Sequence, residues 1–570
     1  MKKAKAPKYM NKYRKKDKDV PSYIYSAIIC VALTVFLFFR FSIALNLHNP
    51  RIWVIASIGS FLFVYIAHLF QGRRDFWFDK GYKEKKGKEV LYRHFNVPIK
   101  SYIAPLVLIG ITLIIALSGS KLINAEKYAA IMNVTDAEFS SDIAESVGTD
   151  SIALMDTASA RMLGDREIGS LSSVVSQFNV SDDYIQIDYL GKPVKVSALN
   201  YTDFFKWKNN RKDGIKGYVM VDPVSMSASF NASEGMKYVP SAYFFDNAYR
   251  HIWLKYPTLM FENLHFEIDE DGKPYYVAAI MKRTVSLFGG KTVSGCVVLD
   301  PVTGEITRYD LADVPKWVDV VFDGDLICEQ YNWFGTLQGG YFNSLFGRKG
   351  CKRVTTYNSN GDSEDETPSV DYGYVAKDGD ILIYTGVTSL NGDSSNIGFL
   401  LANERTGESR YYTVAGADEK SAMAAAEGEV QEKGYQASFP SLINVDGNPT
   451  YIMVLKDSGG LVKLYAAVNV EQYNLVTTAA TQSECIKKYR TLIGSGGVNV
   501  DSTEEQTVTA VIADIKYIVI DGNTYIYLID KEERMFRAKA SEQEDMLLLK
   551  VGDTVELTCS GRYIVSCTKK

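Results

Sequence analysis

Three long runs of apolar residues dominate the first quarter of the chain, at residues 23–45, 52–70 and 102–117, the last continuing towards residue 123. A helix that crosses a lipid bilayer needs about 20 mostly apolar residues. The runs therefore predict three membrane-spanning helices within residues 23–123. The first run is long and the second follows it almost at once, so the pattern is not that of a cleaved signal peptide.

Basic residues flank these runs on one side. Residues 1–100 hold 20 Lys and Arg against 6 Asp and Glu, although the whole chain holds 63 against 68. Nearly all of these cations lie in the tail 1–22 and in the loop 71–100. Because Lys and Arg are enriched in cytoplasmic loops, both segments are predicted to be cytoplasmic and the large C-terminal region extracytoplasmic. The lipid bilayer is thus one predicted partner, and nucleic acid is not expected because the outer region is acidic.

Beyond residue 123 the pattern changes to short stretches rich in β-branched and aromatic residues, separated by glycine turns, which predicts strands. An apolar strand that reaches Asp or Asn and then turns recurs four times, at 217–225, 296–310, 399–412 and 466–474. In the second and third copies, Asp300 and Asn403 are expected to cap the turn. Gly304 and Gly407 are expected to supply the positive φ that brings the chain back as a hairpin.

A second recurring element, Gly-x-Pro, begins a strand at residues 191–193, 272–274 and 447–449. Apolar residues at helical spacing precede two of these strands, over 245–256 and over 422–430, the latter with Asp418 as a plausible N-cap. The predicted repeating unit is therefore a helix laid on an antiparallel sheet.

Residues 241–312, and more weakly 418–488, resemble the PepSY domain. The matching stretches are Asp-Glu-Asp-Gly-Lys-Pro-Tyr-Tyr-Val-Ala-Ala-Ile at 269–280 with Val-Leu-Asp-Pro-Val-Thr-Gly-Glu at 298–305, and their counterparts at 444–455 and 468–474. The resemblance implies a helix-on-sheet module of a kind found in peptidase propeptides and in envelope proteins, where it inhibits or binds and does not catalyse. The second copy lacks Pro-Val-Thr-Gly, and no peptidase is attached.

These patterns together predict an α+β protein with three N-terminal transmembrane helices, tandem helix-on-antiparallel-sheet modules and a small C-terminal β-barrel. Five or six short strands after the Gly-rich break at 494–497 make an OB-like barrel the expected form of the last domain. The expected domains are a basic tail (1–22), three transmembrane helices with their basic loop (23–123), a first α+β module (124–240), a PepSY-like module (241–315), a β-rich module with an aromatic/Gly segment (316–414), a second PepSY-like module (415–493), a linker (494–505) and the barrel (506–570).

Catalytic chemistry finds little support in the sequence. Of the five histidines only His251 and His265 lie in the outer region, and they fall in a predicted helix and a predicted strand, where structural roles are expected. The chain has no HExxH and no CxxC motif, so no catalytic residue, metal site or cofactor is predicted. Acidic residues are plentiful, which keeps a carboxylate pair of the glycosidase type as an alternative.

The most unusual segment, residues 331–346, mixes aromatic residues with Gly and Asn. Rigid aromatic rings concentrate binding energy at protein contacts, although the same rings could pack as an interdomain core. The candidate partner-binding residues are Trp333, Phe334, Tyr341 and Phe342. The favoured function is a non-catalytic, membrane-anchored binding or scaffold protein of the bacterial cell envelope, whose partner is an envelope protein or a cell-wall component. The alternatives are regulation or inhibition of an extracytoplasmic peptidase and a carboxylate-dependent cell-wall hydrolase.

Overall fold

The computed structural model has a mixed α+β architecture, with three apolar helices at the N-terminus followed by several antiparallel sheets, as the sequence predicts. It describes residues 20–78, 99–143, 154–355, 372–377, 379–390, 395–496, 506–520, 523–532, 534–540, 543–560 and 563–570. Most of the basic tail, residues 79–98 of the basic loop and most of the linker 494–505 lie outside this description. The chain divides into two compact units, one of residues 1–137 with 155–413 and one of residues 138–154 with 414–570.

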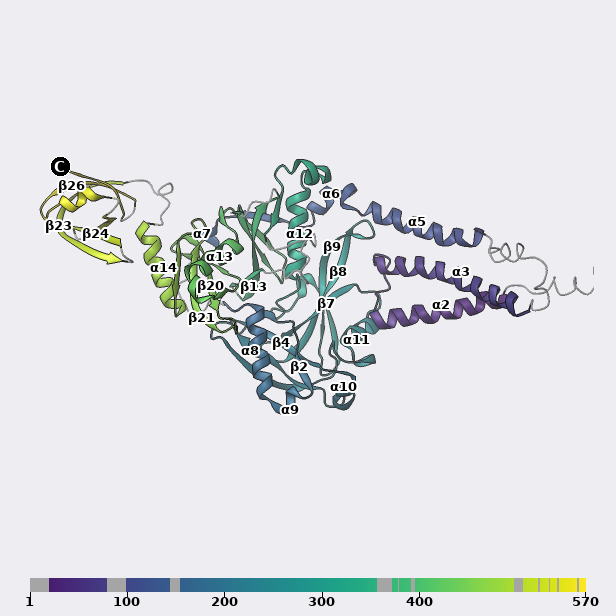
Figure 1. The fold of residues 1–570 in the computed structure, drawn as a ribbon. Coiled ribbons are helices and arrows are strands. Elements are labelled where there is room, and N and C mark those ends of the chain that lie inside the picture. The colour runs from purple at the N-terminus through teal and green to yellow at the C-terminus, as the bar shows by residue number, and fades with distance from the viewer. Residues whose placement is uncertain are drawn as a thin grey trace, which may run out of the picture. The chain divides into compact units, whose positions relative to one another are not determined.

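Three helices are long and apolar enough to cross a membrane, over Tyr23–Phe41, Pro50–Phe70 and Ile103–Ala129. They correspond to α2 (Val20–Phe41), most of α3 (Pro50–Phe78), and α5 (Ile103–Ser118) with α6 (Lys121–Ala129). The short helix η1 (Ile99–Tyr102) precedes α5, and a break at Gly119 and Ser120 separates α5 from α6. In Figure 1 these helices run alongside one another, and α3 packs against both α2 and α5.

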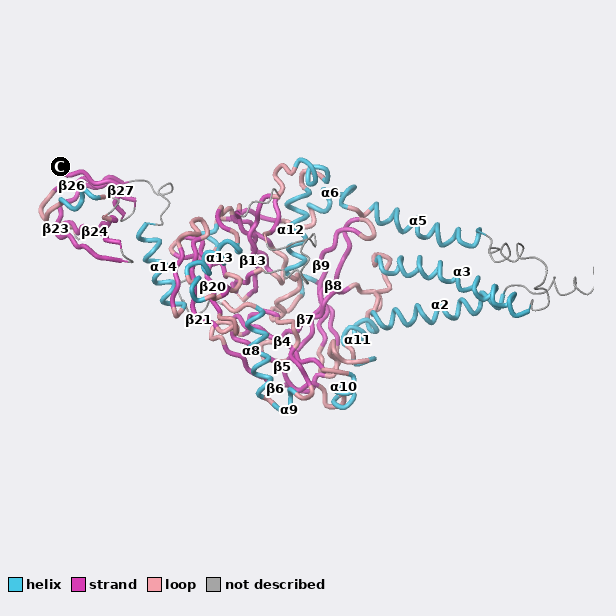
Figure 2. Tube along the Cα trace, in the orientation of Figure 1, coloured by secondary structure: helices cyan, strands magenta, loops and turns pink. Residues whose placement is uncertain are grey.

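After the three apolar helices, further helices alternate with antiparallel sheets (Figure 2). The first module contains α8 (Thr157–Ser170), α9 (Ser172–Val175), β2 (Phe178–Val180), β3 (Ile185–Tyr189), β4 (Lys192–Tyr201), α10 (Phe204–Asn210), β5 (Ile215–Asp222) and β6 (Ser227–Met236). Its strand order is β2-β4-β5-β6, with β3 also paired to β4. The second module contains η3 (Phe244–Asp246), α11 (Ala248–Lys255), β7 (Phe261–Ile268), β8 (Pro274–Val285), β9 (Gly289–Leu299) and β10 (Ile306–Asp310), in the order β10-β9-β8-β7.

Two further modules follow. The third contains η4 (Leu311–Asp313), α12 (Gly324–Leu337), the π-helix η5 (Asn343–Gly347), β11 (Lys352–Val354), β12 (Gly373–Lys377), β13 (Asp380–Ser389), β14 (Ser395–Asn396), β15 (Gly398–Asn403) and β16 (Ser409–Tyr412). The fourth contains β17 (Gly416–Ala417), α13 (Glu419–Glu429), η6 (Gln431–Lys433), β18 (Gln436–Ala437), β19 (Ser441–Val445), β20 (Asn448–Lys456), β21 (Val462–Asn469), β22 (Val476–Ala479) and α14 (Gln482–Gly496). The main sheets run β16-β15-β13-β11 and β18-β20-β21-β22.

A helix followed by antiparallel strands thus occurs four times, and its local signals recur as well. Each of the four helices begins at an Asp or Asn whose side chain accepts the backbone N–H three residues ahead, which is the usual N-cap arrangement. These N-caps are Asp156, Asn247, Asp323 and Asp418. The predicted cap at Asp418 is therefore present, and the same signal marks the other three helices.

The hairpin turns also have the geometry that the sequence predicts. Asp300 and Asn403 each accept backbone N–H groups from two and three residues ahead, at 2.8–3.1 Å. Gly304 and Gly407 have φ of 79° and 75°, a region in which a Cβ is costly. Asp222 makes the equivalent turn after β5 in the first module.

Two features of the organisation were not predicted from the sequence. The third module, expected to be β-rich, holds the strands β11–β16 and also contains α12, whose residues Gly324 and Gly335 lie so close to Tyr372 and to the Lys352 carbonyl that a Cβ would not fit without movement. Tertiary packing therefore selects a helix where glycine and aromatic content disfavour one. The first module does not begin at residue 124, because β1 (Val134–Ala137) pairs in parallel with β16 and α7 (Phe139–Asp142) belongs to the second unit.

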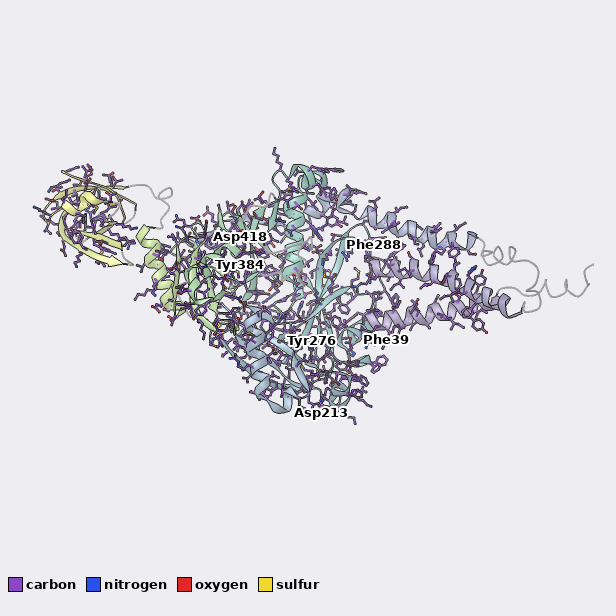
Figure 3. All side chains as sticks on the ribbon, in the orientation of Figure 1. Phe39, Asp213, Tyr276, Phe288, Tyr384 and Asp418 are labelled. Carbon is purple, nitrogen blue, oxygen red and sulfur yellow. The ribbon has the colours of Figure 1, made fainter. Side chains whose placement is uncertain are left out.

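The second module lies between two hydrophobic cores of the first unit. Side chains alternate along β8, so Tyr276, Ala278 and Ile280 join the core shared with the first module, while Val277 and Ala279 join the core shared with the third. A strand that is buried on both faces reads as a continuous apolar run, as the run Tyr275–Ile280 does. Tyr276 is labelled in Figure 3.

The C-terminal strands are β23 (Gln506–Ile520), β24 (Asn523–Asp530), β25 (Met535–Lys539), β26 (Thr554–Ser560) and β27 (Tyr563–Lys569), with η7 (Glu544–Leu548) before β26. They close in the order β23-β24-β25-β27-β26. All of these pairings are antiparallel except the single parallel contact between β25 and β27. Fully buried side chains such as Ile526, Ala538 and Val555 fill the interior.

Candidate functional site

The aromatic segment that was expected to bind a partner forms the second half of α12 and continues into η5. Trp333 is only 5% exposed. Its ring meets the Tyr128 ring of α6 edge-on, with centroids 5.0 Å apart, and the Lys121 ammonium lies 5.3 Å from the Trp333 ring centroid. The expectation that Trp333 contacts a partner is therefore corrected, because its ring is buried between α12 and α6.

The other three candidate residues differ in exposure. Phe334 is half-buried and packs against the core of the third module, and Tyr341 is half-buried against the cluster that holds Trp333. Phe342 is 65% exposed. One of the four predicted contact residues thus lies fully on the surface.

Phe342 belongs to a group of three exposed apolar side chains, which we call the apolar ledge. Its members Phe342, Leu345 and Phe346 are 65%, 46% and 81% exposed. The Asn343 side chain closes the loop beneath them, because its Nδ2 donates to the Lys349 carbonyl at 3.0 Å and its Oδ1 accepts the Lys349 backbone N–H at 3.2 Å. Sequence reasoning missed Leu345 and Phe346, although they are adjacent in the aromatic segment.

The second module is bonded directly to the C-terminal end of α2 and to the residues that follow it. Arg250 of α11 donates from Nε to the Phe39 carbonyl at 2.9 Å, and Trp253 donates from Nε1 to the Ile43 carbonyl at 2.8 Å. The Leu45 backbone N–H donates to the Pro257 carbonyl at 2.6 Å. The second module and the first span are therefore held together by backbone as well as side-chain contacts.

The hairpin between β8 and β9 makes the corresponding contacts with α3 and α5. Phe288 at its tip meets the Trp53 ring at a centroid distance of 6.2 Å, and the hydroxyls of Ser286 and Ser118 are 2.8 Å apart. Phe39 and Phe288 are labelled in Figure 3, near the ends of α2 and α3 that face the sheets. All three spans thus contact the second module.

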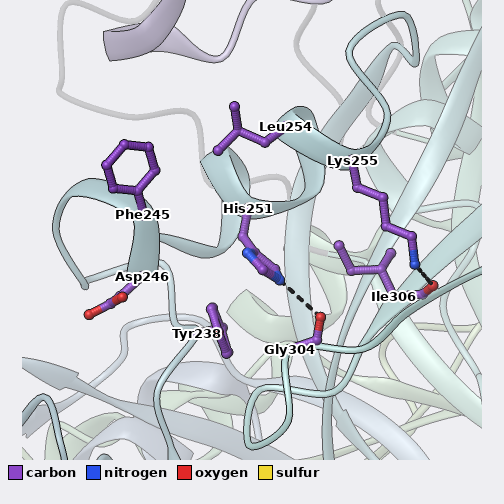
Figure 4. A pocket seen from close by; sticks show the side chains of 8 residues that line it. All are labelled: Tyr238, Phe245, Asp246, His251, Leu254, Lys255, Gly304 and Ile306. Atoms are coloured by element: carbon purple, nitrogen blue, oxygen red, sulfur yellow. Dashed lines mark hydrogen bonds between the residues drawn. The ribbon is translucent and has the colours of Figure 1, made fainter.

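A pocket of about 510 Å³ opens beside α11 (Figure 4), and its lining includes Tyr238, Phe245, Asp246, His251, Leu254, Lys255, Gly304 and Ile306. His251 Nε2 donates to the Gly304 carbonyl at 2.9 Å, and its ring packs at a tilt against Tyr238 with centroids 4.1 Å apart. Lys255 Nζ donates to the Ile306 carbonyl at 2.7 Å. The predicted turn glycine, Gly304, therefore also forms one wall of this pocket, which the sequence did not suggest.

A cluster of buried charged groups joins the first three modules. The Glu267 carboxylate accepts the backbone N–H of Asp319 at 2.8 Å, and the Asp319 carboxylate accepts the backbone N–H of Asp188 at 2.7 Å and a bond from Arg405 at 2.8 Å. Glu267 and Asp319 are 0% and 1% exposed. Burial raises the pKa of Glu267 to about 8 and that of Asp319 to about 7, although Arg405 opposes both shifts. Burial thus favours the protonated form of both carboxyls.

Two further buried groups have shifted pKa values. Burial lowers the pKa of Lys195 to about 8, and its ammonium lies 4.8 Å from the centroid of the Tyr374 ring. Burial raises the pKa of Glu404, with nearby carboxylates adding to the effect. Perturbed pKa values occur at active sites and in structural networks alike. Since none of these side chains lines the pocket beside α11, their arrangement is that of a network between modules.

Within the part of the chain that the structure describes, no group of three or more His, Cys, Asp or Glu side chains is placed to hold a metal ion. No family model and no curated protein matches the chain. The chain is loosely similar to a cobalt-substituted Synechocystis ACO, with 9% identity over 69% of this chain and 65% of that chain, at a TM-score of 0.13. A mutant of that protein gives 8% identity over 71% and 64%, at a TM-score of 0.15. The chain thus spans less than two thirds of these structures, and scores this low carry no conclusion about fold or function.

Proposed function

We propose that this chain is a membrane-anchored binding or scaffold protein of the bacterial cell envelope, that it is non-catalytic, and that its large C-terminal region is extracytoplasmic. The three apolar helices and the two basic segments around them support the anchoring and the orientation. The partner is an envelope protein or a cell-wall component, as expected from the sequence.

The apolar ledge is the observation that carries the binding function. Phe342, Leu345 and Phe346 are large, adjacent and exposed, and contiguous apolar side chains on a solvated domain mark interaction sites. The Asn343 side chain fixes the loop beneath them, so little conformational entropy is lost when a partner binds. The ledge follows α12, whose Trp333 contacts Tyr128 in the last turn of α6. It therefore follows a helix that packs on the C-terminal end of the third candidate span, Ile103–Ala129, and its side chains are open to a protein partner.

The distribution of carboxyl groups favours binding over hydrolysis. A glycosidase-type mechanism needs two carboxyls that reach the substrate. The carboxyls with the most raised pKa values, Glu267, Asp319 and Glu404, are 0–2% exposed. Backbone and Arg405 contacts instead account for the burial of Glu267 and Asp319, since buried charges are paired or hydrogen-bonded.

The same proposal includes the finer fold assignments. The helix-then-antiparallel-strand order of the second and fourth modules, with their Asp/Asn turns, supports PepSY-like modules. The barrel order β23-β24-β25-β27-β26, with one parallel contact and η7 before β26, supports an OB-like barrel. Both kinds of module occur in proteins that act by binding.

Crosslinking in intact cells tests the binding function. With the photo-crosslinker p-benzoylphenylalanine at Leu345, we expect discrete protein adducts that disappear when Phe342 and Phe346 are both replaced by Ser. The same crosslinker at Tyr473, which is 56% exposed elsewhere, is the matched control. Thermal melting of the double variant should be unchanged, because both rings are on the surface. Adducts that persist in the double variant would contradict the proposal that the apolar ledge binds the partner.

Activity assays test the class of function. The purified chain should leave peptidoglycan and casein intact. Turnover that disappears on substitution of a single Asp or Glu would replace the binding function by the hydrolase alternative. For the orientation, cysteine introduced at Asp362 should react with a membrane-impermeant thiol reagent in intact cells, while cysteine at Lys12 or Lys83 should not.

A further inference from the structure

The outer end of α2 sets the depth of the ectodomain relative to a membrane. The apolar span Tyr23–Phe41 has 19 residues, or about 28 Å at 1.5 Å per residue, close to the roughly 30 Å hydrocarbon core of a bilayer. A helix of this length must use nearly all of its residues to cross. Phe39 therefore lies at the outer boundary of the hydrocarbon core, and Arg40 beside it can extend to the headgroups.

An exposed aromatic surface of the ectodomain lies at this same depth. Phe245 is 62% exposed, and its ring meets the Phe39 ring edge-on with centroids 5.6 Å apart. Four more exposed side chains lie on α10, at the start of η3 or on α11, and we call the five together the α10–α11 surface. Their exposures are Phe205 70%, Tyr243 39%, Phe244 53%, Phe245 62% and Leu254 47%.

The rings of this surface are held in place. Phe204 contacts the rings of Phe205, Tyr243 and Phe244 at 5.1–6.3 Å, which connects α10 to the residues around η3. Phe244 has φ of 53°, an uncommon backbone conformation for an aromatic residue, and its carbonyl accepts a bond from the Arg250 guanidinium. Strain of this kind persists where the surroundings impose it, and here it holds an apolar ring outward.

The pocket beside α11 shares two residues with this surface, Phe245 and Leu254. Its charged groups leave an excess of positive charge, because Asp246 is paired with Arg211 at 3.2 Å whereas Lys255 bonds only a neutral carbonyl among the described contacts. The His251 Nε2–H is used by the Gly304 carbonyl. A cationic, partly apolar pocket at the edge of a membrane boundary fits a phosphate-bearing headgroup.

We propose that the α10–α11 surface inserts into the outer leaflet and that the adjoining pocket binds the headgroup of an anionic phospholipid, with Lys255 against the phosphate. This rests on the membrane anchoring proposed above and adds a lipid ligand to it. The α10–α11 surface then contacts the membrane in addition to the three helices. This contact fixes the orientation of the first unit at the bilayer.

Crosslinking to lipid tests the proposal in the full chain. The protein is placed in nanodiscs of equimolar phosphatidylcholine and phosphatidylglycerol, with p-benzoylphenylalanine at Phe245 or, as a control of similar exposure, at Tyr473. Mass spectrometry should find lipid adducts at residue 245 and none at residue 473. The adducts should be enriched in phosphatidylglycerol by about fivefold, since one cation near a membrane surface has an effect of that order on anionic lipid.

Variants at Lys255 separate charge from packing. Lys255→Gln should remove the phosphatidylglycerol enrichment and keep the lipid adducts, while Lys255→Arg should keep both. Absence of lipid adducts at residue 245, or protein adducts in their place, would overturn the membrane contact. Lipid adducts without enrichment, or with enrichment that survives Lys255→Gln, would overturn the headgroup site. The lipid crosslinks at residue 245 do not depend on the apolar ledge. Failure of the proposed partner binding is therefore recognised separately, from the crosslinks at Leu345 in intact cells.

Discussion

Gly304→Ala is expected to destabilise the first unit because the substitution has two separate costs. Gly304 has φ of 79°, where an L-residue costs about 1–2 kcal/mol. An added Cβ would also lie 2.5 Å from Cε2 and 2.8 Å from Cζ of Tyr238, and 3.1 Å from Nε2 of His251. The centroids of the Tyr238 and His251 rings are 4.1 Å apart, so Tyr238 cannot move away freely. Overpacking of this kind costs about 1–3 kcal/mol. The expected loss is about 2–5 kcal/mol.

Gly191→Ala is the matched control for this prediction. Gly191 lies in the same compact unit and has φ of 76°, but no other atom lies within 4 Å of the position that an added Cβ would take. Gly191→Ala should therefore destabilise the unit only through the positive φ of its backbone, by about 1–2 kcal/mol. The difference between the variants, about 1–3 kcal/mol, isolates the contact with Tyr238. At roughly 2–4 °C per kcal/mol, Gly304→Ala should melt some 2–12 °C below Gly191→Ala.

Differential scanning fluorimetry of the full chain in nanodiscs measures both midpoints. Equal midpoints for the two variants would refute the packing argument and show that Tyr238 has room to move. Midpoints equal to that of the parent protein would refute the assignment of positive φ at both turns. Lipid adducts at residue 245 should remain in Gly304→Ala below its melting temperature, because Phe245 is held by Phe39 rather than by the turn.

Three further predictions concern buried groups of the first unit. Trp333→Ala should lower the free energy of unfolding by about 3–5 kcal/mol, because the ring is buried against Tyr128. This loss is measured as a lower melting midpoint, and an unchanged midpoint would contradict the burial of Trp333. The pKa values of Glu267 and Asp319 are raised, so the folded state retains a proton that the unfolded state releases. The free energy of unfolding should therefore fall as pH rises from about 4 to about 8. The slope is about 1.4 kcal/mol per pH unit for one proton. The change in melting midpoint between pH 5 and pH 8 should shrink in Glu267→Gln, and an identical change in parent and variant would contradict the shift. Arg405→Met should cost about 3–5 kcal/mol by leaving Asp319 buried without its ion pair, whereas a small effect at pH 5 and pH 8 alike would show that Asp319 is neutral throughout.

The sequence by itself determined those features that depend on near neighbours in the chain. Apolar runs of sufficient length predicted the three spans, because a helix in a bilayer must satisfy its own backbone hydrogen bonds. Asp300 and Gly304 predicted a turn because capping and positive φ are properties of adjacent residues. The N-cap at Asp418 was recognised for the same reason, and the alternating pattern predicted antiparallel sheets.

Only the tertiary structure decided which side chains meet across long separations. Trp333 and Phe342 belong to one aromatic segment, yet the first is buried against α6 and the second is exposed, because burial depends on what packs over a residue and not on its type. Glu267 and Asp319 are 52 positions apart in the chain, and nothing in their neighbours signals that they share a network. The pocket likewise arises because the Gly304 turn folds back onto α11. These contacts follow from how the modules pack, which local patterning leaves open.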